Sequence, residues 1–394
     1  MRPLSLKFSS RISVLSFFIL IGWNLRGDAQ TRISDVRSSS VQDAQLSLQT
    51  RSPQSQELLY RGDPIQVLGG ADRSGILPTV GETVAEISGG EERNQSSHEL
   101  IEKYRKKITF KSTIDGSIQE AFTIIPPGIV PDETHLVVSL HSWSSDLNQR
   151  SDLESLVFRR GWCYLFPNFR GPNQHPDACG SKLAQQDILD ALEQTLNQNG
   201  LSPSRVFLTG TSGGGHMTML MAGLYPERWR AACAWVGISD LVAWHHTHRG
   251  KRYGNMIEKS CGGAPDQSPA TECEYHDRSP VNFISGASAL PIALFAGIHD
   301  GHRGSVPIRQ SIDAFNVICN HNGDPVVSEL EIQQLSVQNG RLNQPHEGDE
   351  GYSDSLRRKY YLKRSSKDAQ LLIFEGGHEG ISTGTVDWFE KSAE

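Results

Sequence analysis

The sequence lacks an excess of basic residues. Its 394 residues carry 38 lysines and arginines against 45 aspartates and glutamates, which gives a formal net charge of -7. Nucleic-acid binding depends on a basic face that neutralises phosphates, so this balance argues against a nucleic-acid partner. Hydrophobic residues make up 37% and charged residues 21% of the chain. That composition is typical of a globular protein rather than of a fibre or a fully disordered chain.

The sequence also lacks a hydrophobic run long enough to cross a bilayer. The strongest apolar run, residues 12–23, follows the positive side chains of Arg2, Lys7 and Arg11 and precedes the small residues that end at Ala29. It is shorter than the roughly 20 residues that a membrane-spanning helix needs. We therefore expect residues 1–29 to be a signal peptide cleaved after Ala29. The mature protein would then be exported, periplasmic or extracellular, with no membrane span.

Few apolar residues occur between this segment and about residue 104. Residues 30–60 are crowded with serine, glutamine, aspartate and arginine, and residues 61–100 remain polar and glycine-rich. Such a segment buries too little apolar surface to offset the entropy of ordering. We expect residues 30–104 to form a polar, largely disordered tether or arm, and residues 105–394 to form one catalytic domain.

Cysteine is sparse, and no CxxC pair of the zinc-binding kind is present. The six cysteines all follow residue 160, and their even number permits disulfides in an exported chain. The favoured pair is Cys261 with Cys273, which would close a loop between two core elements, while Cys233 lies in an apolar run and is expected to be a buried thiol. The connectivity does not follow from the sequence.

Residues 105–394 alternate between strand-like and helix-like patterns. This alternation predicts an α/β fold with a mostly parallel sheet covered by helices on both faces, preceded by an antiparallel hairpin over residues 107–112 and 119–125. Two insertions, at about 240–285 and 321–357, follow strands and are expected to act as lids over the ligand site. The expected buried strands are residues 136–140, 162–166, 206–208, 231–236, 291–297 and 371–374, with helices at 151–160, 182–197, 216–224, 306–319 and 383–392.

The strongest motif is the pentapeptide of residues 210–214, which reads G-T-S-G-G. It matches G-x-S-x-G between an expected strand and an expected helix, which is the context of a nucleophile elbow. Its glycines permit a tight turn that projects Ser212 from the end of the sheet. Ser212 is therefore the candidate nucleophile, and an acyl-enzyme intermediate is expected.

A serine nucleophile needs a base and an orienting acid, which follow it in the chain order Ser, Asp or Glu, His. Asp300 and His378 each lie in a glycine-rich turn just after an expected strand. Asp240 is the rival acid and His346 the rival base, but His346 lies in a polar insertion without a preceding strand. We favour a Ser212–Asp300–His378 triad, which requires no metal or organic cofactor.

Acyl transfer also needs hydrogen-bond donors for the developing oxyanion. One is the backbone N–H of Gly213, directly after the nucleophile, and the second usually comes from the loop after the third strand. That loop begins at His141, and we expect its donor to be the N–H of Trp143, with the indole forming a wall of the acyl pocket.

A histidine cluster lies in the first insertion. His245, His246 and His248 are close in sequence, but no carboxylate spacing supports a metal site, and we expect them to form part of a polar lid. His299 and His302 flank Asp300 and are expected to shape the loop or the pocket rim.

The domain resembles the catalytic domain of the prolyl oligopeptidase family, within the α/β-hydrolase superfamily. The resemblance rests on the elbow, the Asp300 loop with the sequence of residues 306–311, and the Gly-Gly-His end at His378. Residues 168–171 resemble the N-[FY]-R-G turn of the family, and residues 278–280 resemble its R-S-P segment. The resemblance covers about residues 105–394 and implies the same triad and the hydrolysis of ester or peptide bonds.

Three departures from the family pattern bear on the substrate. The oxyanion loop reads His-Ser-Trp where the family often has His-Gly-Gly, and the spacing from Asp300 to Val306 is longer than usual, with the 321–357 insertion separating acid from base. Only about 75 residues lie between the expected signal and the fold, too few for a propeller of several blades. We therefore expect a carboxylic ester hydrolase, acting on small-molecule or glycan esters. The alternatives are a serine peptidase of prolyl oligopeptidase type and, from another class, an inactive binding module on the same scaffold.

Overall fold

The computed structural model describes residues 97–394, with side chains from residue 101 onward. The expected signal peptide and nearly all of the expected tether lie outside the described residues. Among the described residues, no helix is both long and apolar enough to cross a bilayer.

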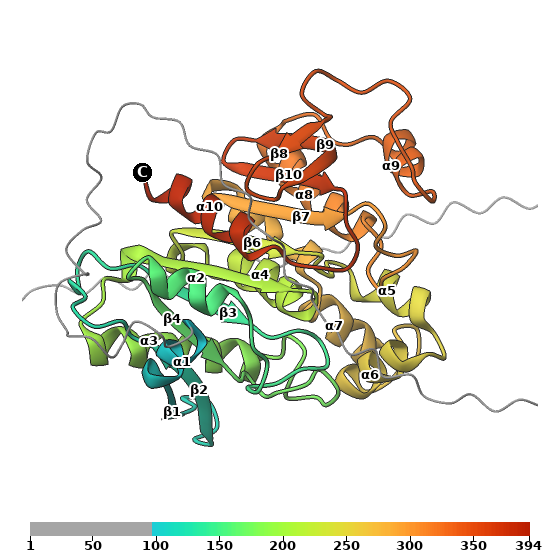
Figure 1. Cartoon of the computed structure of the whole chain (residues 1–394). Helices are drawn as coiled ribbons and strands as arrows, with labels where there is room; N and C mark the ends of the chain where they lie inside the picture. Colours follow the sequence, from blue (N-terminus) through green and yellow to red (C-terminus); the bar gives the residue numbers. More distant parts are fainter. Residues whose placement is uncertain (1–96) are drawn as a thin grey trace, which may run out of the picture. The chain divides into compact units, whose positions relative to one another are not determined.

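A ten-stranded mixed sheet is the framework of the described domain (Figure 1). Its strands lie in the order β1-β2-β4-β3-β5-β6-β7-β10-β9-β8. The six central strands from β4 to β10 are parallel, and the outer strands at both ends are antiparallel. The strand bounds are β1 Arg105–Lys111, β2 Ile118–Ile124, β3 Leu136–Leu140, β4 Cys163–Pro167, β5 Val206–Thr211, β6 Ala231–Trp235, β7 Ile292–Gly297, β8 Gly351–Ser353, β9 Arg358–Ser366 and β10 Ala369–Phe374.

Both faces of the sheet are buried. Side chains alternate across a strand, so that in β3 Leu136 and Val138 join the core on one face and Val137 joins the core on the other. This two-sided burial explains why the central strands read as continuous apolar runs. It confirms the predicted α/β architecture with helices on both faces.

The helices divide between these two cores. The helices α3, α4 and α8 pack on the first face, and α1, α2 and α10 pack on the second. Their bounds, with those of the other α-helices, are α1 Ser97–Tyr104, α2 Leu153–Arg159, α3 Lys182–Asn199, α4 Gly213–Leu224, α5 Leu241–His248, α6 Arg252–Cys261, α7 Pro269–Arg278, α8 Arg309–Asn322, α9 Glu329–Leu335 and α10 Ser382–Ala393.

The two expected insertions take different forms. Residues 240–285 hold α5, α6 and α7, which pack on one another and appear in yellow to light orange in Figure 1. They enclose a third buried cluster that includes Trp143, Trp244 and Tyr275. Residues 321–357 hold α9 and β8, and β8 extends the sheet at its edge.

Outside the two insertions, one α-helix and one strand differ from the sequence-based expectation. The helix α1 lies within residues 30–104, which we expected to be irregular. Its Ile101 is 4% exposed because it packs in the core beside α2. The long strand β9 was also missed. Its residues, RKYYLKRSS, are mostly polar because β9 lies near the sheet edge and buries only Leu362 and Ser366.

The expected Cys261–Cys273 disulfide is absent. All six cysteines are free thiols, and only Cys273 is exposed. Cys261 ends α6 and lies in the same buried cluster as Cys179, whereas Cys273 lies on α7 and faces solvent. The prediction was wrong because the two side chains face different environments. Cys233 is buried, as expected.

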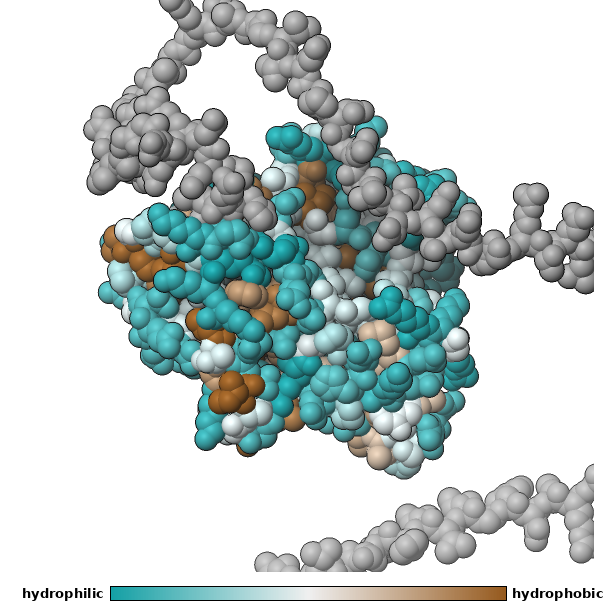
Figure 2. Space-filling model, turned by 60° about the horizontal axis from the view of Figure 1, so that its bottom comes forward, coloured by the Kyte–Doolittle hydropathy of each residue, from teal (hydrophilic) through white to brown (hydrophobic). Residues whose placement is uncertain are grey.

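The described surface is mainly hydrophilic, with small and separate hydrophobic patches in the view of Figure 2. Large exposed apolar side chains include Ile114 and Ile118, which lie at and beside the turn between β1 and β2. Scattered apolar residues of this kind are normal on a protein surface.

Candidate active site

Ser212 lies on a sharp turn between β5 and α4. Its backbone has φ 61° and ψ -115°, a region that non-glycine residues rarely adopt. Its N–H donates to the carbonyl of Trp235 on the neighbouring strand β6 at 2.9 Å, which fixes the turn. The turn directs the hydroxyl away from the sheet, and the side chain is buried to 7% exposure.

The structure brings Ser212, His378 and Asp300 together in one hydrogen-bonded chain. The Ser212 hydroxyl donates to His378 Nε2 at 2.9 Å. The Nδ1–H of His378 donates to Asp300 Oδ2 at 2.7 Å, because a carboxylate oxygen only accepts. The Nε2 atom is therefore the lone-pair nitrogen and faces the hydroxyl, as a general base requires.

The loop after β7 holds Asp300 in place. Its second oxygen, Oδ1, accepts from the N–H groups of Gly301 at 2.9 Å and Val306 at 3.1 Å, and the side chain is almost fully buried. Gly304 allows this packing, because a Cβ there would lie 2.1 Å from Asp300 Oδ1 and 2.6 Å from the Cβ of His378. The sequence did not predict the role of Gly304, since nothing in its neighbours signals a close approach.

The loop after β10 holds His378. Arg358 on β9 pairs with both oxygens of Glu379 at 3.1 Å, and Glu379 accepts from the N–H of Gly377. A second pair links this loop to the loop after β7 that carries Asp300 (the acid loop), since His299 Nε2 lies 2.6 Å from a carboxylate oxygen of Glu375. His299 thus shapes the loop beside Asp300, as expected, while His302 contacts the carbonyl of Ser336.

The loop of residues 141–149 lies against the start of α4. A Cβ on Gly213 would lie 2.4 Å from the backbone nitrogen and Cα of Trp143, so the two backbones touch. None of the hydrogen bonds of the described residues uses the N–H of Trp143 or of Gly213 as a donor. Both expected oxyanion donors are therefore adjacent and free, beside the Ser212 turn.

The side chains around this loop are fixed by packing. His141 stacks on Phe169 with ring centroids 3.8 Å apart, and the N–H of Ser142 donates to Gln149 at 2.9 Å. The Trp143 indole is 2% exposed and packs edge-on against Trp244 of α5, at 4.6 Å between centroids. The indole is thus part of the third buried cluster, beneath the α5–α7 insertion.

The two rival triad residues lie elsewhere. Asp240 caps α5, with its carboxylate accepting from the N–H of Ala243 at 3.0 Å. His346 lies in the 321–357 insertion, where its N–H donates to Asp349. Neither hydrogen-bonds to Ser212, His378 or Asp300.

The three histidines of α5 lie in different surroundings. His245 pairs with Glu258 at 2.7 Å, and His248 lies 2.7 Å from the carbonyl of Ser305 in the acid loop. His246 faces a pocket instead. Within residues 97–394 there is no cluster of histidine, cysteine and acidic side chains suited to a metal ion.

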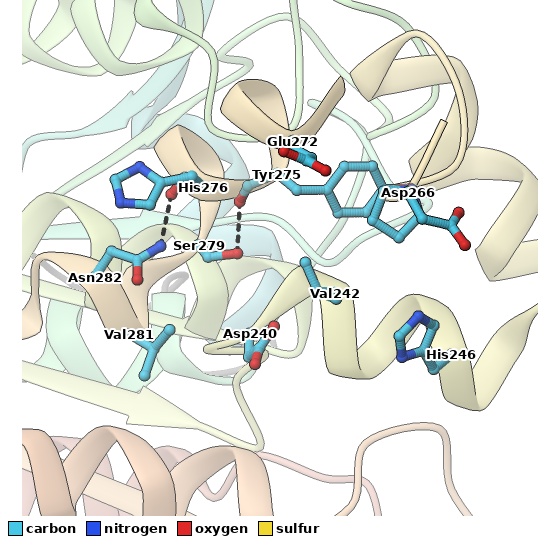
Figure 3. A pocket seen from close by; sticks show the side chains of 11 residues that line it. Asp240, Val242, His246, Asp266, Glu272, Tyr275, His276, Ser279, Val281 and Asn282 are labelled. Atoms are coloured by element: carbon cyan, nitrogen blue, oxygen red, sulfur yellow. Dashed lines mark hydrogen bonds between the residues drawn. The ribbon is translucent and has the colours of Figure 1, made fainter. Parts of the chain in front are cut away.

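That pocket, of about 430 Å³, lies between α5 and α7 (Figure 3). The side chains of Asp240, Asp266 and Glu272 surround it together with His246 and His276. None of the triad residues lines it, so it is a separate feature from the site around Ser212.

Comparison with known proteins agrees with the geometry. Residues 149–330, less than half of the chain, match the prolyl oligopeptidase family. The human acylamino-acid-releasing enzyme is 25% identical over 249 residues, which cover 56% of this chain and 32% of that protein. An acetylxylan esterase of Coprinopsis cinerea is 40% identical over 50 residues, 13% of each protein. The chain thus matches about a third or less of the length of these relatives.

Solved structures of similar fold include the acylaminoacyl peptidase of Pyrococcus horikoshii. The two share 21% sequence identity with a TM-score of 0.47, over 59% of this chain and 38% of that structure. The described domain has an α/β-hydrolase fold and resembles the catalytic domain of the prolyl oligopeptidase family, as the sequence predicted. The family match and the curated relatives indicate a serine hydrolase, either a peptidase or an esterase.

Proposed function

We propose that the protein is a serine peptidase of the prolyl oligopeptidase type, which cleaves short peptides through an acyl-enzyme on Ser212. The observation that carries this proposal is the hydrogen-bonded chain from Ser212 through His378 to Asp300. The choice of peptide bonds is supported by the family match and by the acylamino-acid-releasing enzymes among the relatives. A serine peptidase of this type was the alternative predicted from the sequence, and the ester hydrolase favoured there becomes the second candidate.

In the proposed reaction, His378 Nε2 accepts the hydroxyl proton as Ser212 Oγ attacks the substrate carbonyl. Asp300 holds the imidazole in the required tautomer and stabilises the imidazolium. The N–H groups of Gly213 and Trp143 bind the oxyanion. His378 then gives its proton to the leaving amine as the C–N bond breaks. Water next attacks the acyl-enzyme while His378 accepts its proton, and His378 returns that proton to Ser212 Oγ as the bond between the acyl carbon and Oγ breaks and the acid leaves.

A carboxylic ester hydrolase is the second candidate. Its support is the 40% identity to the Coprinopsis cinerea acetylxylan esterase, although that match spans only 50 residues. The same triad and the same acyl-enzyme would serve an ester, whose alkoxide leaving group needs less help from the protonated His378 than an amine does. The two candidates therefore differ in the leaving group and not in the nucleophile.

Fluorophosphonate labelling with intact-mass detection tests the shared nucleophile. We expect one adduct on the wild-type protein and none on Ser212→Ala. Ser204→Ala is the matched control, because Ser204 is exposed just before β5, at the opposite end of this strand from Ser212. No adduct on folded wild-type protein would overturn the proposal in favour of the inactive binding module.

A substrate comparison separates the two candidates. We expect acetylated aminoacyl anilides and short blocked peptides to be cleaved with a higher kcat/KM than acetylated xylan oligomers. Cleavage of acetylated xylan alone, lost in Ser212→Ala, would replace the peptidase proposal by the esterase.

We also propose that the protein is exported after cleavage at Ala29. The support is the basic start and the short apolar run of the sequence, which lie outside the described residues. Expression of the full chain in a bacterium, followed by fractionation and N-terminal sequencing, would yield periplasmic or secreted protein that starts at Gln30. Full-length protein retained in the cytosol would contradict the proposal.

A further inference from the structure

One peptide bond of the acid loop lies between Asp300 and the helix α5. It joins Ser305 to Val306, and both of its polar groups are hydrogen-bonded. The N–H of Val306 donates to Asp300 Oδ1 at 3.1 Å. The carbonyl of Ser305 accepts from the indole N–H of Trp244 at 2.8 Å, and His248 Nε2 lies 2.7 Å from the same oxygen. Because the bond is trans, its N–H and its carbonyl point in opposite directions, one toward the triad and one toward α5.

Both groups of α5 act as donors to this carbonyl. The indole N–H of Trp244 can only donate, and a carbonyl oxygen can only accept, so the Nε2 atom of His248 must carry a proton. A carbonyl oxygen has two lone pairs and can accept both bonds. The two rings pack edge-on at 5.0 Å between centroids, and Trp244 is fully buried. The Ser305 carbonyl is therefore held by two fixed donors.

Hydrogen bonds at the two ends of one peptide unit reinforce each other. A donor on the carbonyl oxygen draws electron density from the peptide, which makes the N–H of the same unit a stronger donor. Here that N–H binds Asp300, whose other oxygen accepts from His378 at 2.7 Å, and His378 in turn lies 2.9 Å from the Ser212 hydroxyl. A continuous series of hydrogen bonds thus runs from α5 to the nucleophile.

The same helix also contacts the loop that carries the expected oxyanion donor. The ring of Trp244 packs on the indole of Trp143 at 4.6 Å between centroids. Both rings share the third buried cluster with Val306, which is 2% exposed. The helix α5 therefore lies against both loops that serve Ser212, which the expectation of a polar lid does not explain.

We propose that Trp244 and His248 are positioning residues of the triad. By binding the Ser305 carbonyl they fix the N–H of Val306 on Asp300 and so hold the carboxylate that orients the base. Neither side chain hydrogen-bonds to a triad residue, so both act through the peptide bond. The effect on turnover rests on the proposed function, whereas the effect on the hydrogen bonds of the triad does not. The two effects are therefore measured separately.

Substitutions on α5 remove the two donors one at a time. Trp244→Phe loses the indole N–H and keeps an aromatic ring against Trp143. His248→Leu loses the donor at Nε2, whereas His248→Gln places an amide donor close to the same position. The matched control is His246→Leu, because His246 lies on the same helix but faces the pocket between α5 and α7 (Figure 3). All variants are made in the full chain.

Proton NMR gives a readout that needs no substrate. The proton shared by His378 Nδ1 and Asp300 resonates far downfield of the other protons, and its position reports on the hydrogen bond. We expect this resonance to shift in Trp244→Phe and in His248→Leu. It should lie at the wild-type position in His248→Gln and in the His246→Leu control.

Turnover gives the second readout, with the cleaved substrate from the panel above. We expect kcat to fall about threefold to tenfold in Trp244→Phe and in His248→Leu, with KM within about twofold, because the loss concerns the base and not substrate binding. His248→Gln should keep most of the activity. The double variant Trp244→Phe/His248→Leu should lose more than the product of the two single losses, since either donor alone can still hold the carbonyl.

Three outcomes would overturn the proposal. The first is an unshifted resonance with unchanged kcat in both Trp244→Phe and His248→Leu. The second is an equal loss in His248→Gln and His248→Leu, which would assign the effect to the packing of the ring. The third is an equal loss in the His246→Leu control, which would assign it to the stability of α5. Wild-type protein that cleaves no substrate, with the resonance shifted in the variants as expected, would refute the proposed function alone.

Discussion

Two groups of residues flank Ser212 and differ in their hydrogen bonding: the triad side, formed by His378 and Asp300, and the oxyanion side, formed by the N–H groups of Trp143 and Gly213. On the triad side, both ring nitrogens of His378 and both carboxylate oxygens of Asp300 have hydrogen-bond partners. On the oxyanion side, the N–H groups of Trp143 and Gly213 are free. In the proposed reaction, the groups that transfer the proton are therefore assembled before substrate binds, whereas the proposed oxyanion donors are free until it binds.

Removal of the general base, His378, should have the largest effect on turnover. We expect His378→Ala to lower kcat by about 10⁴-fold or more, because Ser212 then has no proton acceptor within reach. Steady-state kinetics and the rate of fluorophosphonate labelling measure the loss. His302→Ala is the control, since His302 lies in the same loop as Asp300 but its side chain hydrogen-bonds to the carbonyl of Ser336 and not to the triad. Near-normal turnover in His378→Ala would refute the assignment.

Lowering the pH should destabilise the fold through His216, whose ring packs against Trp143. Burial lowers the pKa of this imidazole from its ordinary 6.5 to about 4, so the folded state disfavours the charged form. The contribution of His216 to the free energy of unfolding is fully present above pH 6.5. It falls by about 3 kcal/mol as the pH drops toward 4, because only the unfolded chain then binds the proton. Burial also lowers the pKa values of His135 and His141, which act in the same direction.

Urea denaturation of the wild type and His216→Gln between pH 7 and pH 4 isolates this contribution. The variant has no imidazole at position 216, so its free energy of unfolding should depend less steeply on pH. Equal slopes for the two proteins would show that His216 does not titrate as the structure implies.

A single methyl group should disturb the triad without removing any of it. A Cβ at position 304 would lie 2.1 Å from Asp300 Oδ1, so Gly304→Ala must move either Asp300 or His378. We expect kcat to fall roughly 10²-fold, since displacements of about 1 Å carry costs of that order. Gly377→Ala is the matched control, because its added Cβ would meet no atom within 4 Å. An equal loss in both variants would point to loop flexibility rather than to the clash.

The smallest expected effect concerns the link between the acid and base loops. Glu375 accepts from Tyr361 at 2.5 Å and pairs with His299, and the Tyr361 hydrogen bond is the main cause that lowers the pKa of its carboxyl. Because Glu375 is 40% exposed, we expect Glu375→Gln to cost only about 1 kcal/mol of stability near neutral pH, with kcat reduced less than tenfold.

Thermal unfolding and steady-state kinetics measure this effect. Because the pKa is lowered, the contribution of Glu375 is present above the ordinary carboxyl pKa and is lost on acidification below it. The control is Glu390→Gln, which removes an exposed pair with Arg160 away from the site and should change little. A larger loss in the control would contradict a role for the link.

The sequence predicted those parts of the molecule whose signals are local. The buried strands were visible as apolar runs, and Ser212, Asp300 and His378 were visible as polar residues in glycine-rich turns at strand ends. These positions require only the periodicity of the chain and the rule that parallel strands end at one edge of the sheet.

Features that depend on distant contacts were not predictable in this way. The burial of Ile101 makes α1 part of the domain, and the closeness of Gly304 to Asp300 appears only once the loop is folded. The carbonyl that accepts from Trp244 and His248 lies up to 61 residues away from them in the chain. The wrong pairing of Cys261 with Cys273 has the same origin, because closeness in sequence does not decide which way two side chains face.

The burial of the cysteines makes thiol chemistry a measure of how the domain opens. Burial raises the pKa of the Cys163 and Cys179 thiols to about 12, and the pKa values of Cys233 and Cys261 are raised as well. A thiol reagent should therefore modify Cys273 at once and reach the other five only when the chain around them separates. The order in which the five react would rank the layers of the fold by the free energy of their opening.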